Sequence, residues 1–297
     1  MKPLDYLFAV IVMVVWGVNF VASKWAVAEI PPLLFTAVRF MLVGALLAPF
    51  FRVPDLRGRL PFLMLFGLVL GVGHFGMTFI GLRGADASTA AIMIQLQVPM
   101  STLLAFLFFD DKVGWWRGIG IALAFCGVVL LAGEPQAAEL WAVCLIGFSA
   151  LMWASSNVLL KKSRPINPFA LNGWMALCAV PQLLILSLIF EQDQIESLTN
   201  ASTRAWGSFF FTVLFSSVLA YSLWYRLISK YPMNQVVPLT LLAPVIGVIS
   251  GVVLMDDPLS MERLAGSALT LSGVALIQLR EVRRARHARQ AAKAAAP

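Results

Sequence analysis

The chain has 297 residues, of which 60% are hydrophobic and 12% are charged. A soluble domain carries about 25% charged residues, so this composition excludes a protein that faces water on all sides. The formal net charge of +7 does not indicate nucleic-acid binding, because the basic residues lie in short loops and a tail without interleaved aromatic side chains. The expected surroundings are therefore a lipid bilayer.

Ten segments are long and apolar enough to be transmembrane helices, since about 20 apolar residues cross the hydrocarbon core. In the first half they are Leu4–Ala26, Pro32–Phe51, Pro61–Leu82, Ala87–Phe109 and Gly114–Ala132. In the second half they are Leu140–Leu160, Pro168–Phe190, Trp206–Ile228, Asn234–Met255 and Met261–Leu279. The predicted fold is an all-α membrane protein, and its first span is expected to be retained because no small-residue cleavage site follows it.

The distribution of charge predicts the orientation of these spans. With the N-terminus in the cytoplasm, most of the 22 Lys and Arg residues fall on the inner side, and the outer segments hold only Lys24, Arg83, Arg204 and Arg263. Positive residues concentrate on the cytoplasmic side of membrane proteins. We therefore expect a multi-pass protein of the bacterial inner membrane with both termini in the cytoplasm.

Landmark residues of the first half recur in the second. Trp16 recurs as Trp153, Pro99 as Pro244, Asp110-Asp111 as Asp256-Asp257, and Gly120 and Gly127 as Gly266 and Gly273. Because each half has an odd number of spans, the second half begins on the opposite side of the membrane and the repeat is inverted. The predicted domains are residues 1–134, residues 135–280 and a basic cytoplasmic tail, residues 281–297. Inverted repeats are typical of secondary transporters, which bind substrate near the midplane between the halves.

Three groups of residues also carry a family resemblance: Trp16-Gly17-Val18-Asn19-Phe20, Arg39-Phe40, and Trp153 with Asn157 and Lys161-Lys162. They resemble the EamA family of the drug/metabolite transporter superfamily, over about Leu4 to Leu279. The segments Gln95-Leu96-Gln97 and Pro31-Pro32-Leu33 look most like its O-acetylserine/cysteine exporters, with aromatic-amino-acid exporters as near relatives. The resemblance implies export of amino acids or closely related small zwitterionic metabolites. Export of another metabolite class on the same fold, of the drug or nucleotide-sugar type, is the alternative.

Polar and aromatic side chains inside the spans are the candidates for binding substrate, because a polar group in hydrocarbon must be paired or line water. Those on shared helix faces are expected to line a central cavity: Trp16, Asn19, His74, Thr78, Phe79, Gln95, Pro99, Trp153, Asn157, Ser217, Tyr221 and Pro244. Asn19 and Asn157 could instead bond across helices. Gln97 lies about 200° around an α-helix from Gln95, so at most one of the two is expected to face substrate.

Several intramembrane residues have a structural interpretation. His74 could carry a proton, but a hydrogen-bonded structural role is favoured, and Arg39 is expected to pair with backbone carbonyls near the outer end of its span. The pairs Gly67/Gly71 and Gly247/Gly251 are expected to let helices approach closely. Pro99 and Pro244 each free a carbonyl four residues earlier, which a hydrated site could use.

Missing motifs argue against catalysis. The sequence has no G-x-x-x-x-G-K-[ST], no H-E-x-x-H and no Asp or Glu in the middle of a span, so neither a nucleotide-hydrolysing P-loop nor a catalytic or metal site is expected. The three cysteines lie in apolar runs and are expected to pack in the core. We therefore predict a transporter without cofactor or metal, expected to act as a monomer on a small-molecule substrate by alternating access.

Overall fold

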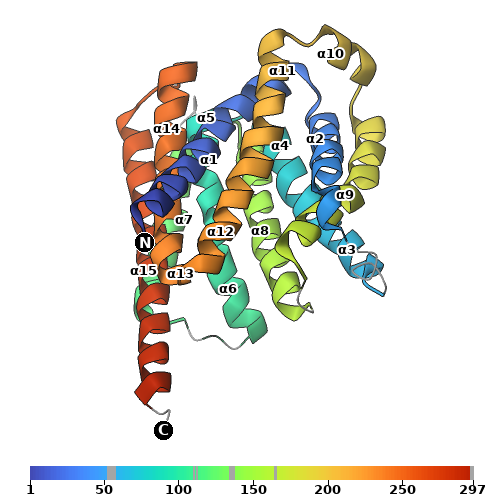
Figure 1. Cartoon of the computed structure of the whole chain (residues 1–297). Coiled ribbons are helices and arrows are strands. Elements are labelled where there is room, and N and C mark those ends of the chain that lie inside the picture. The colour runs from blue at the N-terminus through green and yellow to red at the C-terminus, as the bar shows by residue number, and fades with distance from the viewer. Residues whose placement is uncertain (52–57, 110, 112, 134–137, 164–165, 295–297) are drawn as a thin grey trace.

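The computed structural model describes residues 1–51, 58–109, 111, 113–133, 138–163 and 166–294, and in these ranges the chain is helical with one isolated β-bridge (Figure 1). The first half holds α1 (Pro3–Glu29), α2 (Pro32–Leu47), η1 (Ala48–Phe50), α3 (Leu60–Phe66), η3 (Gly67–Gly76), α4 (Met77–Gly81), α5 (Ala87–Met93), η4 (Ile94–Leu96), α6 (Gln97–Phe109) and α7 (Trp115–Ala132). The second holds α8 (Leu140–Lys162), α9 (Pro168–Phe190), α10 (Gln194–Asn200), α11 (Thr203–Phe210), η5 (Phe211–Ala220), α12 (Tyr221–Lys230), α13 (Met233–Val236), η6 (Val237–Leu241), α14 (Leu242–Met255) and α15 (Met261–Ala294).

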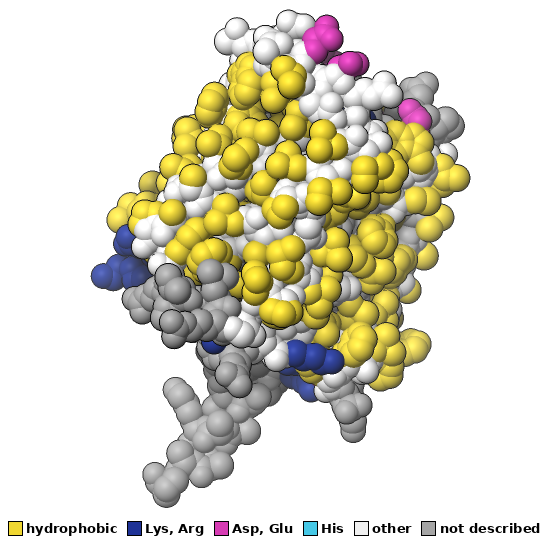
Figure 2. Space-filling view, turned by 90° about the vertical axis from the view of Figure 1, so that its right-hand side faces the viewer, with side chains coloured by type: hydrophobic (Ala, Val, Ile, Leu, Met, Phe, Trp, Pro, Cys, Tyr) yellow, Lys and Arg dark blue, Asp and Glu magenta, His cyan; other side chains and the backbone are white. Residues whose placement is uncertain are grey.

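Nine helical stretches of the described chain are long and apolar enough to cross a membrane, and they coincide with the first nine predicted spans. The protein is therefore a multi-pass membrane protein. The predicted tenth span is the first part of α15. This helix is less apolar than the other nine, and it continues past Leu279 to Ala294. Figure 2 shows one face of the molecule covered by hydrophobic side chains, with Asp and Glu at its upper end and Lys and Arg toward its lower end.

Helix ends near the membrane need partners for their free backbone groups. Proline stands in the first turn of α1, α2 and α9, where its missing N–H costs no hydrogen bond. At the start of α2, the Glu191 carboxylate accepts hydrogen bonds from Leu33 N at 2.7 Å and Leu34 N at 3.0 Å. A residue after α9 thus caps α2 and ties the two packed helices together.

Two helices of each half depart from regular α geometry, and they do so at corresponding places. The third membrane helix of each half contains a ten-residue π-helical segment, η3 or η5. The fourth contains a 3₁₀ segment, η4 or η6, shortly before Pro99 or Pro244. Proline removes an amide donor and clashes with the carbonyl four residues back, which accounts for the 3₁₀ geometry. Side-chain directions in these segments therefore deviate from α-helical spacing.

The helices exchange partners between the halves. α1 packs against α14 and η5, α8 packs against α6 and η3, α2 packs against α9, and α7 packs against α15. The recurring glycines lie in the α7–α15 contact. A Cβ atom at Gly120 would lie 2.8 Å from the Gly273 carbonyl oxygen, and one at Gly266 would lie 2.9 Å from that of Gly127. The recurring Asp110 and the predicted boundary between residues 134 and 135 lie outside the described residues.

The two G-x-x-x-G pairs also lie at helix contacts, as the sequence predicted. A Cβ atom at Gly67 would lie 3.0 Å from Ala179 N on α9, and one at Gly247 would lie 2.6 Å from Ala91 Cβ on α5. These positions therefore serve close packing between helices.

An ionic cluster joins the halves at the ends of α1 and α14 and the starts of α5 and α15. Arg263, which is 1% exposed, donates from Nη2 to Asp86 Oδ2 at 2.9 Å, and Lys24 Nζ lies 3.8 Å from Asp86 Oδ1. Asp257 accepts a hydrogen bond from Ser88 N at 2.9 Å. Burial, reinforced by the neighbouring Asp257, raises the pKa of Asp86 despite these two basic partners.

Candidate functional site

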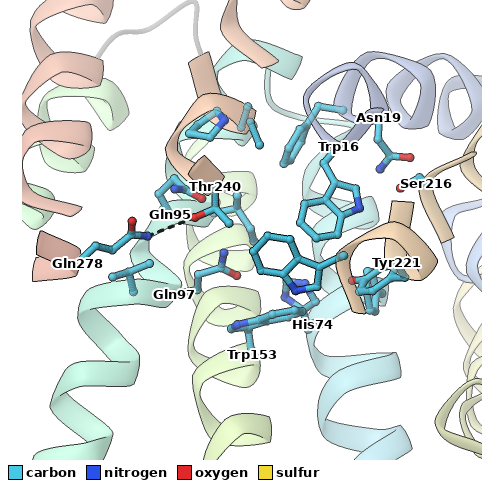
Figure 3. Close-up of a pocket in the computed structure, with 18 of the residues that line it drawn as sticks. Trp16, Asn19, His74, Gln95, Gln97, Trp153, Ser216, Tyr221, Thr240 and Gln278 are labelled. Carbon is cyan, nitrogen blue, oxygen red and sulfur yellow. Dashed lines mark hydrogen bonds between the residues drawn. The ribbon is translucent and has the colours of Figure 1, made fainter. Parts of the chain in front are cut away.

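A cavity of about 290 Å³ lies between the two halves. Its lining comes from twelve of the helical elements: Trp16, Asn19, Phe20, Arg39, His74, Phe75, Ala91, Ile94, Gln95, Gln97, Val98, Trp153, Ser216, Tyr221, Trp224, Thr240, Ala243, Pro244 and Gln278. Figure 3 shows Gln95, Gln97 and Gln278 on one side of this cavity and Asn19, Ser216 and Tyr221 on the other. The described lining contains no Asp or Glu, and Arg39 is its one permanent charge.

Aromatic rings from both halves form much of the wall. The ring of Trp16 lies 5.3 Å from that of Tyr221 and 5.5 Å from that of Trp224, centroid to centroid. The His74 ring lies 4.9 Å from the Trp153 ring. Such walls bury apolar ligand groups and attract cations through their ring faces.

His74 is held in place by backbone and side-chain contacts. It is 6% exposed, and its Nδ1 lies 3.0 Å from the Ser149 carbonyl oxygen. Because a carbonyl can only accept, Nδ1 carries the proton in this contact. The Thr78 hydroxyl lies 2.7 Å from the His74 carbonyl oxygen and 2.9 Å from Ser149 Oγ. This arrangement agrees with the hydrogen-bonded structural role favoured from the sequence.

Arg39 has a different setting from the one predicted. Its partner is the Ser217 hydroxyl, which accepts from Nε at 3.0 Å and from Nη2 at 2.8 Å. The guanidinium carbon also lies 5.3 Å from the centroids of the Phe75 and Phe79 rings. The expected pairing with carbonyls near the outer end is therefore wrong, because a hydroxyl of η5 and two aromatic faces lie within reach instead.

The predicted site residues divide into three groups. Seven line the main cavity: Trp16, Asn19, His74, Gln95, Trp153, Tyr221 and Pro244. Thr78 and Phe79 line a smaller adjoining cavity of about 80 Å³, which Asn19 and His74 share. The described lining of neither cavity includes Pro99, Asn157 or Ser217. Asn157 is exposed, with its Nδ2 3.5 Å from Ser101 Oγ on α6, and Ser217 lies behind Arg39.

Several lining residues were not among the predicted ones. Gln97 lines the cavity together with Gln95, so the expectation that at most one faces it does not fit this geometry. Gln95 lies within the 3₁₀ turn of η4, which ends immediately before Gln97 and departs from α-helical spacing. Gln278 on α15 approaches Thr240 Oγ1 to 3.4 Å. Gln278 is a lone amide in the apolar run before Leu279. It could have been predicted from the sequence in the same way as Asn19, as a polar side chain inside a span.

Comparisons with known proteins agree with this architecture. The model of the EamA-like transporter family matches residues 4–133 and again residues 140–279. A Salmonella typhimurium protein named probable amino-acid metabolite efflux pump is 32% identical over 288 residues, 92% of this chain and 94% of that protein. An Escherichia coli K12 protein of the same name is 30% identical over 286 residues, with the same coverage of each chain. A solved crystal structure has the same fold, with a TM-score of 0.63, 17% identity, and coverage of 96% of this chain and 99% of that one.

Proposed function

This chain belongs to the EamA-like transporter family, as the sequence resemblance predicted, and from that premise we propose that it exports amino acids or closely related zwitterionic metabolites across the bacterial inner membrane. The observation that carries the proposal is the lining of the cavity, which combines aromatic walls, amides and one arginine without a carboxylate. A zwitterion has no net charge, so such a site needs dipoles of both signs more than a strong opposite charge. The relatives named as probable amino-acid metabolite efflux pumps support the same substrate class.

We infer that the membrane domain has ten helices in two inverted halves, with α15 as the tenth crossing. Two observations support this arrangement. The π-helical and 3₁₀ segments recur in the third and fourth helices of each half. In this arrangement α1 corresponds to α8 and α14 to α6, so the α1–α14 contact and the α8–α6 contact are equivalent. The helices α2 and α9 correspond to each other, as do α7 and α15, and each packs against its own counterpart. That pattern is expected of a two-fold axis lying in the membrane plane.

Alternating access then follows from the place of the cavity. It lies where the halves meet, so rocking one half against the other would expose it to each side in turn. The site is expected to bind weakly, because a few dipoles and a roomy aromatic wall distinguish side chains poorly. A millimolar dissociation constant corresponds to a binding free energy of about −4 kcal/mol.

Transport by the purified protein in liposomes tests the proposal. The liposomes are loaded with a panel of labelled amino acids, and release is followed with and without a pH gradient against protein-free liposomes. Protein-dependent release of several neutral amino acids is expected. A nucleotide sugar moved in preference to every amino acid would contradict the proposal, as would displacement of the best amino acid by a micromolar quaternary-ammonium drug.

A further inference from the structure

Several residues that line the main cavity carry a buried polar atom without a hydrogen-bond partner. Among the described residues that line it, three side chains have such a buried atom: Arg39 Nη1, Asn19 Oδ1 and Gln278 Oε1. Buried polar groups in native proteins are nearly always paired, and leaving one unpaired is costly. One of these atoms belongs to a cation and two are acceptors, so the cavity offers free groups of both kinds to a ligand.

The Arg39 guanidinium is fixed so that one edge stays free. Ser217 Oγ holds Nε and Nη2, and this hydroxyl in turn donates to the Thr212 carbonyl oxygen at 2.8 Å. Phe75 and Phe79 lie against the guanidinium. A guanidinium has five N–H donors, so both donors of Nη1 and one of Nη2 are left. The Nη1–Nη2 edge has the geometry that binds a carboxylate through two parallel hydrogen bonds.

Electrostatics favours an anionic group at this edge. Arg39 is 2% exposed, and no salt bridge in the described part of the chain involves it. A buried cation inside a membrane is expensive unless it is paired, and such residues mark substrate pathways. A ligand carboxylate would supply the missing counter-charge, whereas a ligand with only an ammonium group would place a second cation beside the first.

We propose that Arg39 is the carboxylate-binding residue of the transported amino acid, and that Asn19 Oδ1 accepts a hydrogen bond from its ammonium group. This assignment rests on the proposed function and sharpens it. Trp16, next to Asn19 on the same helix, and Tyr221 line the same part of the cavity and contribute ring faces that attract the ammonium. The cavity then recognises the two charges of the ligand backbone, while the remaining wall accommodates its side chain.

Ligand analogues that differ in one charge test the assignment on the full-length protein in detergent. Binding of L-phenylalanine, L-phenylalaninamide, phenethylamine and 3-phenylpropionate is measured by titration calorimetry, and a second series uses L-serine and L-serinamide. In the wild type, replacing the carboxylate by a carboxamide is expected to weaken binding about tenfold or more, the range for a charge-assisted hydrogen bond. The variant Arg39→Gln should bind each acid and its amide within about threefold of each other, and Arg39→Lys should keep the preference at lower affinity.

A second variant separates the ammonium contact. Asn19→Leu is expected to weaken the binding of L-phenylalanine but not the binding of 3-phenylpropionate, because 3-phenylpropionate has no ammonium group to contact Asn19. Elution from a size-exclusion column and thermal unfolding report whether each variant is folded. If Arg39→Gln does not fold, the wild-type series and Arg39→Lys decide the question, since a merely structural arginine would not change the ranking of acid and amide.

The outcomes distinguish this assignment from the proposed function. Equal affinities for acid and amide in the wild type, or an undiminished preference in Arg39→Gln, would overturn the Arg39 assignment while amino-acid export stands. Equal loss of both ligands in Asn19→Leu would overturn the ammonium contact. Preferred binding of 3-phenylpropionate over both amino acids would keep the Arg39 assignment and overturn zwitterion export. Binding of none of the acids would overturn both.

Discussion

Gly17 offers a test that joins the packing of the helices to the geometry of the cavity. A Cβ atom there would lie 2.7 Å from Ile246 Cβ and 2.8 Å from the Ala243 backbone oxygen, both on α14. Ordinary contacts of a Cβ atom begin near 3.4 Å, and a backbone oxygen cannot rotate away. The substitution Gly17→Ala therefore forces α1 and α14 apart by roughly half an ångström. Trp16 and Ala243, which line the cavity, lie at this contact.

Two opposing effects set the size of the change. Alanine in a helix interior is favoured over glycine by about 1 kcal/mol. Overpacking a tight contact costs about 1–3 kcal/mol. The cost for Gly17→Ala is expected near the upper end of this range, because one of the obstructing atoms is the Ala243 backbone oxygen. A net loss of about 1–2 kcal/mol is expected. Gly118→Ala and Gly147→Ala are matched controls, because nothing lies within 4 Å of a Cβ atom at either position, and they should be neutral or stabilised.

Thermal unfolding in detergent, followed by tryptophan fluorescence, compares the three variants. A chain of this size shifts its Tm by about 2–4 °C per kcal/mol, so Gly17→Ala should melt several degrees below Gly147→Ala. Transport per folded molecule should also fall, because the separation displaces Trp16. Gly17→Ala as stable and as active as Gly147→Ala would refute the close approach of α1 and α14.

Three further predictions concern the ends of the helices. Glu191→Ala should lower the free energy of unfolding by about 2 kcal/mol, because two backbone N–H groups and the Ser187 hydroxyl lose a charged but partly exposed acceptor. Glu191→Gln should be intermediate, and equal Tm values for all three proteins would exclude the cap. Burial raises the pKa of Asp86 above 3.8, so the folded protein holds this proton to higher pH than the unfolded chain does. The contribution of Asp86 to stability is then lost as the pH rises through its folded pKa. As the pH falls from about 7 toward 3.8, the Tm of the wild type should therefore rise relative to that of Asp86→Asn. A Tm difference between the two proteins that does not change with pH would contradict this. Reporters fused after Leu259 and after Ala294 should lie on opposite sides of the membrane, and the same side for both would remove α15 from the set of crossings.

The spans were predictable because their signal is local. Length and apolar composition within one segment decide whether a helix can cross a bilayer, and nine predicted spans coincide with such helices. α15 was harder because Glu262 and Arg263 lie in its first turn and basic residues follow its apolar part. Arg263 is nevertheless buried in contact with Asp86, a partner that no reading of the helix alone could supply.

The site was only partly predictable because its geometry depends on irregular backbone and on distant partners. Gln95 and Gln97 line one cavity only because the helix is not a regular α-helix between them. Arg39 and Ser217 are far apart in sequence, and Ser217 belongs to a π-helical segment. The position of a residue around a single helix follows from the sequence only where the spacing is α-helical, and it does not determine which face meets which neighbour. The polar residues could therefore be identified, but Asn157 was predicted in the cavity and Arg39 was not predicted in the site.

The proposed inverted repeat gives Gly17 an equivalent position in the second half. The offset that relates Trp16 to Trp153 places Ala154 at the position equivalent to Gly17. Ala154 is fully buried on α8, so at this position the second half carries the methyl group that the α1–α14 contact excludes at Gly17. The two halves are therefore unequal in side-chain volume at this position, and the α1–α14 contact has no room for a methyl group at Gly17.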